Sequence, residues 1–216
     1  MLIKLIVCRV PSQHRERFAR GQRRWSILSG APGFLGQLGG WNRDDPSQAV
    51  IVGLWRSDGA YANFMADMHD PIFEGGEQPG SYDAISVTLW DQLCDMPGMT
   101  AAIPTAIRVS GLIRLARCEL LPNRRDHFVR AQHTIWNPGM GACDGILAGA
   151  FTQSRDRDDE FLVCTLWRSA ADHQAYLAGP FTELRRRSEV EKDCASLTGY
   201  VVATVPDWSV WATPET

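Results

Sequence analysis

The sequence has no long apolar run, no surplus of positive charge and no clustered cysteines or histidines. No apolar segment approaches the roughly 20 residues that a membrane-spanning helix requires. Lysine and arginine total 22 against 25 aspartates and glutamates, which gives a net charge of −3. Because binding to nucleic-acid phosphates needs a basic surface, we expect no nucleic-acid partner. The lack of an apolar run of membrane-spanning length leads us to expect no membrane partner.

Sequence signatures of metal, phosphate and nucleophile sites are also missing. The chain contains no C-x-x-C, no G-x-S-x-G, no H-E-x-x-H and no glycine-rich phosphate loop, so we predict no cofactor and no metal. The apolar segment Met1 to Val10 carries Lys4 and Arg9 and has no small-residue cleavage site, which favours a strand over an export signal. We therefore expect a cytoplasmic protein whose six dispersed cysteines are reduced thiols.

What the sequence does have is an internal repeat. The tetrapeptide Leu54-Trp55-Arg56-Ser57 recurs unchanged at positions 166–169, and Phe18-Ala19-Arg20-Gly21-Gln22 resembles the segment at 128–132. Six of the eight tryptophans form three pairs at similar spacing: Trp25 with Trp136, Trp55 with Trp167 and, more approximately, Trp90 with Trp208. Since tryptophan is rare, the pairing indicates a tandem duplication.

Both halves show the same order of predicted elements. In the first half the patterns predict strands at 2–10, 34–41, 49–55 and 82–93, with helices at 12–28 and after Ser57, a helix-capping residue. In the second half they predict strands at 109–121, 145–153, 160–167 and 196–204, with helices at 123–136 and 169–178 and a short helix at 181–192. This order is β-α-β-β-α-β, the ferredoxin-like unit.

The duplication predicts the fold class and the domain organisation. We expect an α+β protein with ferredoxin-like repeats at 1–94 and 107–216 and a linker at 95–106. A four-stranded sheet with helices on one face must cover its other face. The two antiparallel sheets are therefore expected to pack face to face as a pseudo-twofold, eight-stranded barrel. The chain would then be a monomer with an internal pseudo-dimer, and further oligomerisation stays open.

The repeated Leu-Trp-Arg-Ser strand end, followed by an aromatic helix, resembles the dimeric α+β barrel superfamily. That superfamily includes antibiotic-biosynthesis-monooxygenase-like proteins and haem-degrading monooxygenases. The segment containing Trp55, Tyr61, Phe64 and His69-Asp70 also resembles the YdbC-like proteins of unknown function. The resemblance implies cofactor-free oxidation of polyaromatic molecules, haem degradation, isomerisation or simple ligand binding, because the motif identifies the fold better than the activity.

Haem degradation in that superfamily uses an asparagine on the first strand and a tryptophan and a histidine on the second helix. Here Phe64 stands at the tryptophan position and Glu74 at the histidine position, and the first strand has no asparagine. In the second half the matching aromatic residue is Tyr176, with no histidine after it. The resemblance therefore implies that the haem-degrading residues are missing.

His69 and Asp70 are the best candidates for chemistry. A histidine can act as a general base near neutral pH, and a neighbouring carboxylate can orient it. Ala178-Gly179 occupy the corresponding place in the second half, so the pair does not arise from the duplication. The alternative interpretation is a histidine that interacts with a helix C-terminus, followed by an aspartate that begins a turn.

Four aromatic residues, Trp25, Trp55, Tyr61 and Phe64, are candidates for the wall of a ligand pocket. Alternatively, they fill the core between helices and sheet. Two function hypotheses follow: a monooxygenase-like enzyme acting on a small apolar or aromatic molecule, or a non-enzymatic module for ligand binding or stress response. A cavity that reaches His69 would favour the enzyme, and a cavity filled by the tryptophans would favour the non-catalytic module.

Overall fold

The computed structural model describes residues 1–96, 98–100 and 102–213, which form two compact units. Unit 1 comprises Met1–Leu89 and the C-terminal segment from Val202, and unit 2 comprises Trp90–Val201. Each unit has its own hydrophobic core between a sheet and helices.

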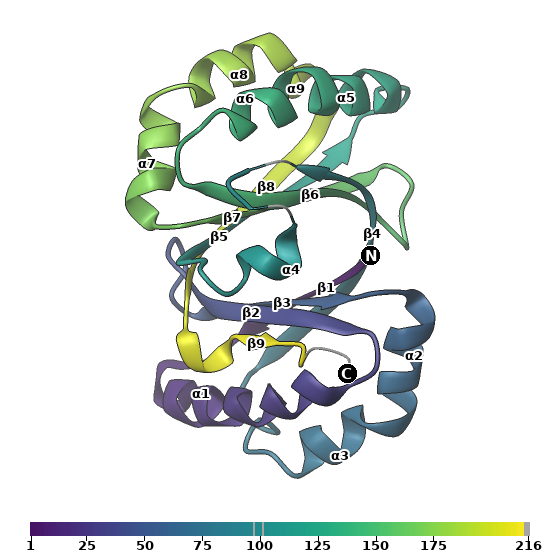
Figure 1. Cartoon of the computed structure of the whole chain (residues 1–216), viewed down its shortest axis with the longest axis vertical. Coiled ribbons are helices and arrows are strands. Elements are labelled where there is room, and N and C mark those ends of the chain that lie inside the picture. Colours follow the sequence, from purple (N-terminus) through teal and green to yellow (C-terminus); the bar gives the residue numbers. More distant parts are fainter. Residues whose placement is uncertain (97, 101, 214–216) are drawn as a thin grey trace. The chain divides into compact units, whose positions relative to one another are not determined.

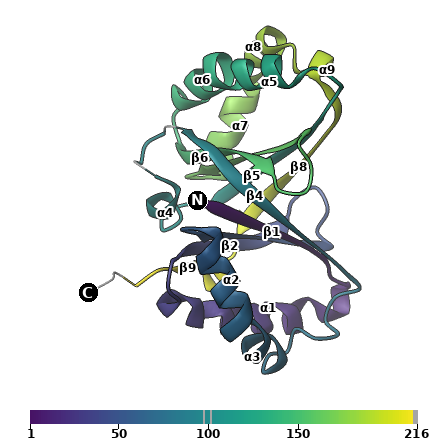
Figure 2. The same cartoon turned by 90° about the vertical axis from the view of Figure 1, so that its right-hand side faces the viewer.

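Unit 1 is a ferredoxin-like sheet with helices on one face (Figures 1 and 2). Its strands are β1 (Leu2–Arg9), β2 (Phe34–Asn42), β3 (Gln48–Trp55), the first part of β4 (Ala84–Met96) and the short β9 (Val210–Trp211). Its helices are the 3-10 helices η1 (Ser12–His14), η2 (Arg24–Gly30) and η4 (Pro206–Trp208) and the α-helices α1 (Arg15–Arg23), α2 (Asp58–Asp67) and α3 (His69–Glu74). The repeat's own strands pair in the order β4-β1-β3-β2.

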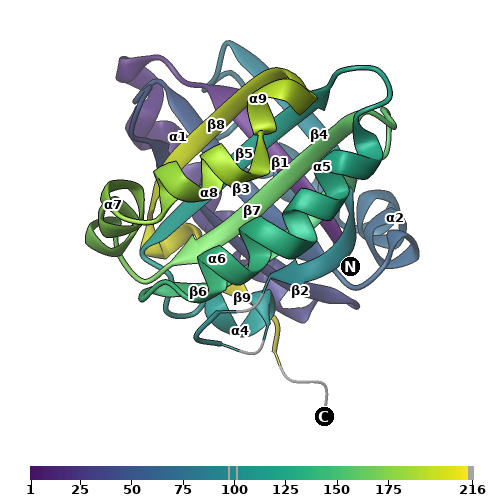
Figure 3. The same cartoon turned by 90° about the horizontal axis from the view of Figure 1, so that it is seen from above.

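Unit 2 repeats this arrangement, and Figure 3 shows its helices α5, α6 and α8, whose bounds follow, in front of its strands. Its strands are β5 (Leu112–Leu120), β6 (Ile146–Ser154), β7 (Glu160–Trp167) and β8 (Cys194–Thr204), in the order β8-β5-β7-β6. Its helices are α4 (Ile103–Ala106), α5 (Arg125–Ala131), the π-helix η3 (Gln132–Trp136), α6 (Asn137–Gly141), α7 (Ala170–Ala178), α8 (Phe181–Ser188) and α9 (Val190–Asp193).

Local signals in the two repeats produce the same local structure. The hydroxyl of Ser57 accepts a hydrogen bond from the Ala60 backbone N–H (3.2 Å), and that of Ser169 accepts one from Asp172 (3.1 Å), so the predicted helix caps are confirmed. Gly33 and Gly145 precede β2 and β6 with φ of +72° and +84°, a conformation that favours glycine. The duplication therefore includes the turns as well as the core.

The last strand of each repeat extends beyond its own unit. Residues Trp90–Met96 of β4 pair with β6 inside unit 2, and residues 202–204 of β8 pair with β2 inside unit 1. The compact units therefore do not coincide with the predicted repeats, whose boundaries at 94 and 107 stay a prediction about the duplication. The predicted linker contains the end of β4 and helix α4, while Pro97 and Ala101 lie outside the described residues.

Three local expectations are corrected. The helix expected at 12–28 is divided into η1, α1 and η2, and α3 occupies a segment that we expected to be irregular. Trp90 lies in a strand whereas Trp208 lies in a 3-10 helix, so this third tryptophan pair does not occupy equivalent elements. The first two pairs do: Trp25 and Trp136 follow the first helix of each repeat, and Trp55 and Trp167 end a central strand.

The predicted fold class is confirmed: the chain is an α+β protein made of two ferredoxin-like repeats. Among the helices of the described residues, none combines the length and the apolar character needed to span a bilayer.

Candidate functional site

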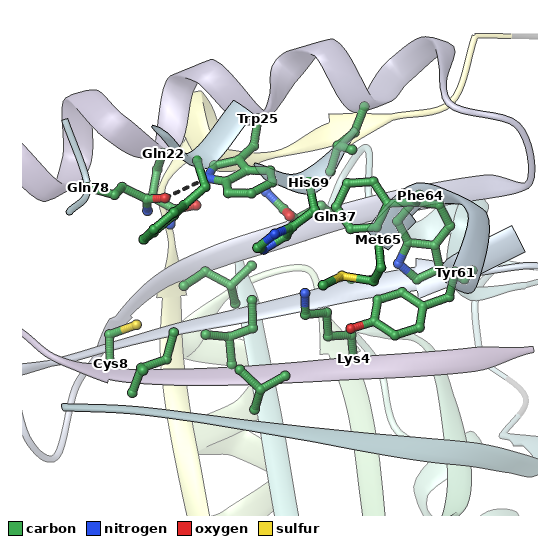
Figure 4. A pocket seen from close by; sticks show the side chains of 18 of the residues that line it. Lys4, Cys8, Gln22, Trp25, Gln37, Tyr61, Phe64, Met65, His69 and Gln78 are labelled. Atoms are coloured by element: carbon green, nitrogen blue, oxygen red, sulfur yellow. Dashed lines mark hydrogen bonds between the residues drawn. The ribbon is translucent and has the colours of Figure 1, made fainter. Parts of the chain in front are cut away.

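Unit 1 contains a pocket of about 360 Å³ between its sheet and its helices (Figure 4). Strands β1, β2, β3 and β4 contribute its floor, and α1, η2, α2 and α3 contribute the opposite wall. Small-molecule sites typically measure about 300–1,000 Å³ and combine apolar walls with a few polar groups. The pocket is therefore large enough for a compact ligand of two or three fused rings.

The four aromatic residues predicted from the sequence all line this pocket. Trp55 and Phe64 stack with their ring centres 4.7 Å apart, and Tyr61 lies 5.8 Å from Trp55 in an edge-to-face arrangement. Trp25, from η2, meets Phe64 edge to face with the ring centres 6.4 Å apart. These rings leave a cavity open beside them, so they do not fill the space completely. That they bind a ligand stays a prediction.

Trp25 is held in place by a residue that sequence reasoning missed. Its indole N–H donates to the side-chain oxygen of Gln78 at 2.7 Å (Figure 4). Gln78 is buried because its segment packs directly on α1 at Gly21, where an added Cβ would lie 2.4 Å from the Gln78 side chain. Only a glycine at position 21 allows this approach.

His69 lies at the pocket, and Asp70 lies outside it. The Nδ1 atom of His69 lies 2.7 Å from a carboxylate oxygen of Asp70, and the ring contacts Trp25, Phe64 and Phe73. His69 lines the pocket with 23% of its side chain exposed, whereas the Asp70 side chain is 76% exposed and is not part of the wall. With Nδ1–H donating to Asp70, Nε2 is the nitrogen left to accept a proton.

The local backbone explains why two neighbouring residues meet. Helix α2 ends at Asp67, and His69 is the first residue of α3. Both residues therefore lie in the first turn of α3, directly after the break at Met68 between the two helices, and their side chains meet there. The structure thus places His69 at the start of α3 and directly after the C-cap residue of α2, so the interpretation of a helix C-terminal histidine stands beside the catalytic one.

Lys4 is a charged residue of the pocket that sequence reasoning also did not select. It is only 8% exposed, and its ammonium group lies 5.2 Å from the centre of the Tyr61 ring and 5.7 Å from that of Phe64. Burial lowers the pKa of Lys4 from 10.5 to about 8. Among the described residues that line the pocket there is no aspartate or glutamate. The position of Lys4 on a predicted strand gave no signal that its side chain would be buried.

Unit 2 has a smaller pocket, of about 120 Å³, at the equivalent place. Arg114 corresponds to Lys4 and is paired in register with Thr165, whereas Lys4 is paired with Gly53. The Thr165 hydroxyl accepts a hydrogen bond from the Trp167 indole N–H at 3.0 Å. Glycine at position 53 provides neither that hydroxyl nor its volume. Of these two equivalent pockets, the larger one therefore lies in unit 1.

The counterpart of His69 in unit 2 is Phe181, which corrects the expected match to Ala178. Phe181 lies 6.0 Å from Trp136, as His69 lies 5.7 Å from Trp25. In each pair, a tryptophan of the helical segment that follows α1 or α5 contacts the first residue of α3 or α8. An apolar ring thus takes the place of the imidazole, and among the described residues a histidine lines the pocket of unit 1 but not that of unit 2.

The residues present do not fit the haem chemistry of the superfamily. Phe64 is packed against Trp55, and Glu74 is exposed at the end of α3 and outside the pocket wall. Within the described residues, no group of three or more histidine, cysteine, aspartate or glutamate side chains is placed to hold a metal ion. All six cysteines have thiols that are not joined in disulfides.

Two ferredoxin-like repeats in one chain, with a pocket between sheet and helices, define a protein of the dimeric α+β barrel class. The fold resembles that of a proposed monooxygenase from Lactobacillus acidophilus NCFM, with a TM-score of 0.73 and 13% identity over 97% of this chain and 95% of that chain. It also resembles an anthrone oxidase-like protein, with a TM-score of 0.67 and 13% identity over 99% and 94% of the two chains.

The sequence identifies the family more narrowly. The family described as "Domain of unknown function (DUF4937)" matches residues 2–90. The chain is 38% identical over 94 residues to the uncharacterized protein YdbC of Bacillus subtilis (strain 168), which covers 43% of this chain and 79% of that protein. The chain therefore belongs to the YdbC family. The matched residues 2–90 include every residue that lines the unit 1 pocket.

Proposed function

We propose that the unit 1 pocket binds a small aromatic molecule and that the protein oxidises it with molecular oxygen, as a monooxygenase-like enzyme. The observation that carries this proposal is the aromatic cavity of about 360 Å³ that reaches His69. An apolar wall with one histidine and few other polar groups suits a flat, poorly hydrated substrate. The similar fold of an anthrone oxidase-like protein suggests anthrones as the first class of molecule to test.

The chemistry needs no external reductant if the substrate supplies all the electrons. A methylene group between aromatic rings, converted by O₂ to a carbonyl group, gives one molecule of water: R₂CH₂ + O₂ → R₂C=O + H₂O. His69 Nε2 would remove the first proton, and Asp70 would hold the other nitrogen. The aromatic wall would orient the ring system above the sheet.

A non-enzymatic ligand-binding role is the second candidate, and the exposure of Asp70 favours it. A carboxylate that is 76% exposed orients a histidine weakly, because water competes for its hydrogen bonds. Tight binding without oxygen consumption would identify this role. In either case the ligand is a small aromatic molecule, and a cytoplasmic location stays a prediction.

Replacing Gly53 with threonine should close the pocket. The threonine would copy Thr165 of unit 2, and a Cβ at position 53 would lie 3.8 Å from Trp55 Nε1 and 3.9 Å from Lys4 Cβ, which are ordinary contacts. Because the strand accepts a β-branched residue readily, we expect normal folding with binding of anthrone or naphthalene weakened about tenfold or more. Quenching of tryptophan fluorescence measures the affinity.

Gly53→Ala provides the graded control, since it adds one methyl group and should reduce the affinity less. Thermal unfolding followed by circular dichroism confirms that both variants fold. Unchanged aromatic binding by a folded Gly53→Thr protein would show that the ligand binds elsewhere.

Replacing His69 with alanine should reduce oxygen uptake about 10²- to 10⁴-fold if His69 is the base. The measurement is oxygen consumption with anthrone and a panel of hydroquinones, with product identified by mass spectrometry. His133→Ala is the matched control, because His133 lies in unit 2 and lines neither pocket. A wild-type protein that binds these compounds but consumes no oxygen would contradict the enzymatic part of the proposal and leave the binding role.

A further inference from the structure

The strongest unexplained feature of the pocket is a buried cation without an acid partner. Lys4 is more than nine-tenths buried, and Figure 4 shows its amine pointing from β1 into the pocket toward the helices. Among the described residues, no hydrogen-bond acceptor or carboxylate contacts that amine. Two ring faces more than 5 Å away offer it only weak attraction. Burying an ammonium ion in such surroundings costs free energy unless another group supplies a compensating negative charge.

The other titratable groups that face this cavity do not supply a compensating negative charge. Burial raises the pKa of the Cys8 thiol to about 12 and also raises the pKa values of Tyr61 and Tyr82, so all three are neutral at pH 7. His69, on the opposite wall, has an imidazole side chain, which supplies no negative charge. The wall therefore contains no group that is negative at neutral pH.

A second donor lies beside Lys4. The indole N–H of Trp55 has no acceptor among the described residues, whereas its counterpart in Trp167 donates to Thr165. Gly53 is paired with Lys4 across the strands, and an added Cβ there would contact both Trp55 Nε1 and the Lys4 side chain. The missing side chain thus leaves room next to both donors.

We propose that Lys4 and the Trp55 N–H form an oxyanion-binding end of the pocket, and that its ligands are aromatic molecules carrying a negatively charged oxygen, either a phenolate or a carboxylate. This inference rests on the proposed binding of an aromatic molecule and names its class. The rings would lie against Trp55, Tyr61 and Phe64, while the oxygen accepts hydrogen bonds from Lys4 and Trp55. The low pKa of Lys4 agrees with this arrangement, since a bound anion would restore its ordinary protonation.

The test compares ligands of the same shape and different charge. Isothermal titration calorimetry at pH 7 with naphthalene-2-carboxylate and the neutral naphthalene-2-carboxamide should show the carboxylate binding about ten- to a hundredfold more tightly. Lys4→Met should abolish that preference while retaining the carboxamide affinity. Lys4→Arg keeps the charge, as Arg114 does in unit 2, and should retain the preference.

The phenolate arm uses 4-nitrophenol, whose anion is yellow. Wild-type protein should shift the bound probe to its yellow form at a pH where the unbound probe is mostly colourless, and Lys4→Met should not. A shift with 4-nitrophenol but no preference for the carboxylate would restrict the class to phenolates, and the converse result would restrict it to carboxylates.

The outcomes separate this inference from the proposed function. If neither naphthalene compound nor 4-nitrophenol binds the wild type, the proposed aromatic pocket is overturned. If the carboxamide binds as tightly as the carboxylate and 4-nitrophenol keeps its normal titration, the aromatic pocket stands and the oxyanion site is overturned. A preference that survives in a folded Lys4→Met protein also overturns it.

Discussion

Replacing Trp167 with alanine is expected to lower the free energy of unfolding by about 4 kcal/mol, the largest effect that we predict for a single side chain. Trp167 has no exposed surface and packs against Tyr176 and His173, with ring centres 5.1 and 5.3 Å away. Its removal would leave a cavity in the core of unit 2 and would also remove the hydrogen bond to Thr165. Urea unfolding followed by circular dichroism measures the change.

Two further variants divide this effect into its parts. Trp167→Phe keeps an aromatic ring and loses the hydrogen bond, so about 1–2 kcal/mol is expected. Ile27→Ala removes a side chain that is 57% exposed and should change stability by less than about 0.5 kcal/mol. A Trp167→Ala protein as stable as wild type would contradict the packing described for unit 2.

Replacing Lys4 with methionine is expected to increase the free energy of unfolding at pH 7, by as much as about 3 kcal/mol. The pKa of Lys4 is about 8 in the folded protein against an ordinary 10.5, so folding at pH 7 must confine a charge that the unfolded chain keeps in water. Methionine has a similar length, is apolar and fills irregular space well. The same variant should lose the anion preference proposed above.

The lowered pKa of Lys4 determines how the stability difference between wild type and Lys4→Met changes with pH. Below pH 8 Lys4 is charged in both states, and the cost of burying the charge is fully present. Between about pH 8 and 10.5 the folded protein releases the proton first, so the unfolded state binds more protons and wild-type stability rises relative to the variant. Above that range both states are neutral at Lys4, and the difference should shrink toward zero.

Lys192→Met is the matched control, because Lys192 is the other lysine in the chain and its side chain is 66% exposed. It should change stability by less than about 0.5 kcal/mol at every pH. A Lys4→Met protein that is less stable than wild type, or a difference that does not change with pH, would show that Lys4 has a favourable partner. A stability gain with loss of binding would instead fit a residue retained for function.

The sequence by itself determined the duplication, the order of elements and the aromatic wall. These follow from local signals: the serine caps before α2 and α7, the alternation along strands, and tryptophans that recur at strand ends because both cores need the same bulky side chain. The sequence also placed His69 next to Asp70. It gave the wrong match for His69 in unit 2, although His69 and Phe181 are separated by the same 112 positions as Trp55 and Trp167.

Only the tertiary structure decided which polar groups face the pocket. Whether Lys4 is buried depends on Gly53 across the strands, on Tyr61 and Phe64 from α2, and on the absence of an acid from the described pocket wall. None of these can be read from a single charge on an apolar strand, because side-chain burial depends on residues that are distant in the sequence. The same holds for the ends of β4 and β8, which pair with strands that are distant in the sequence. Because of this pairing, the boundaries between the two units lie within β4 and β8.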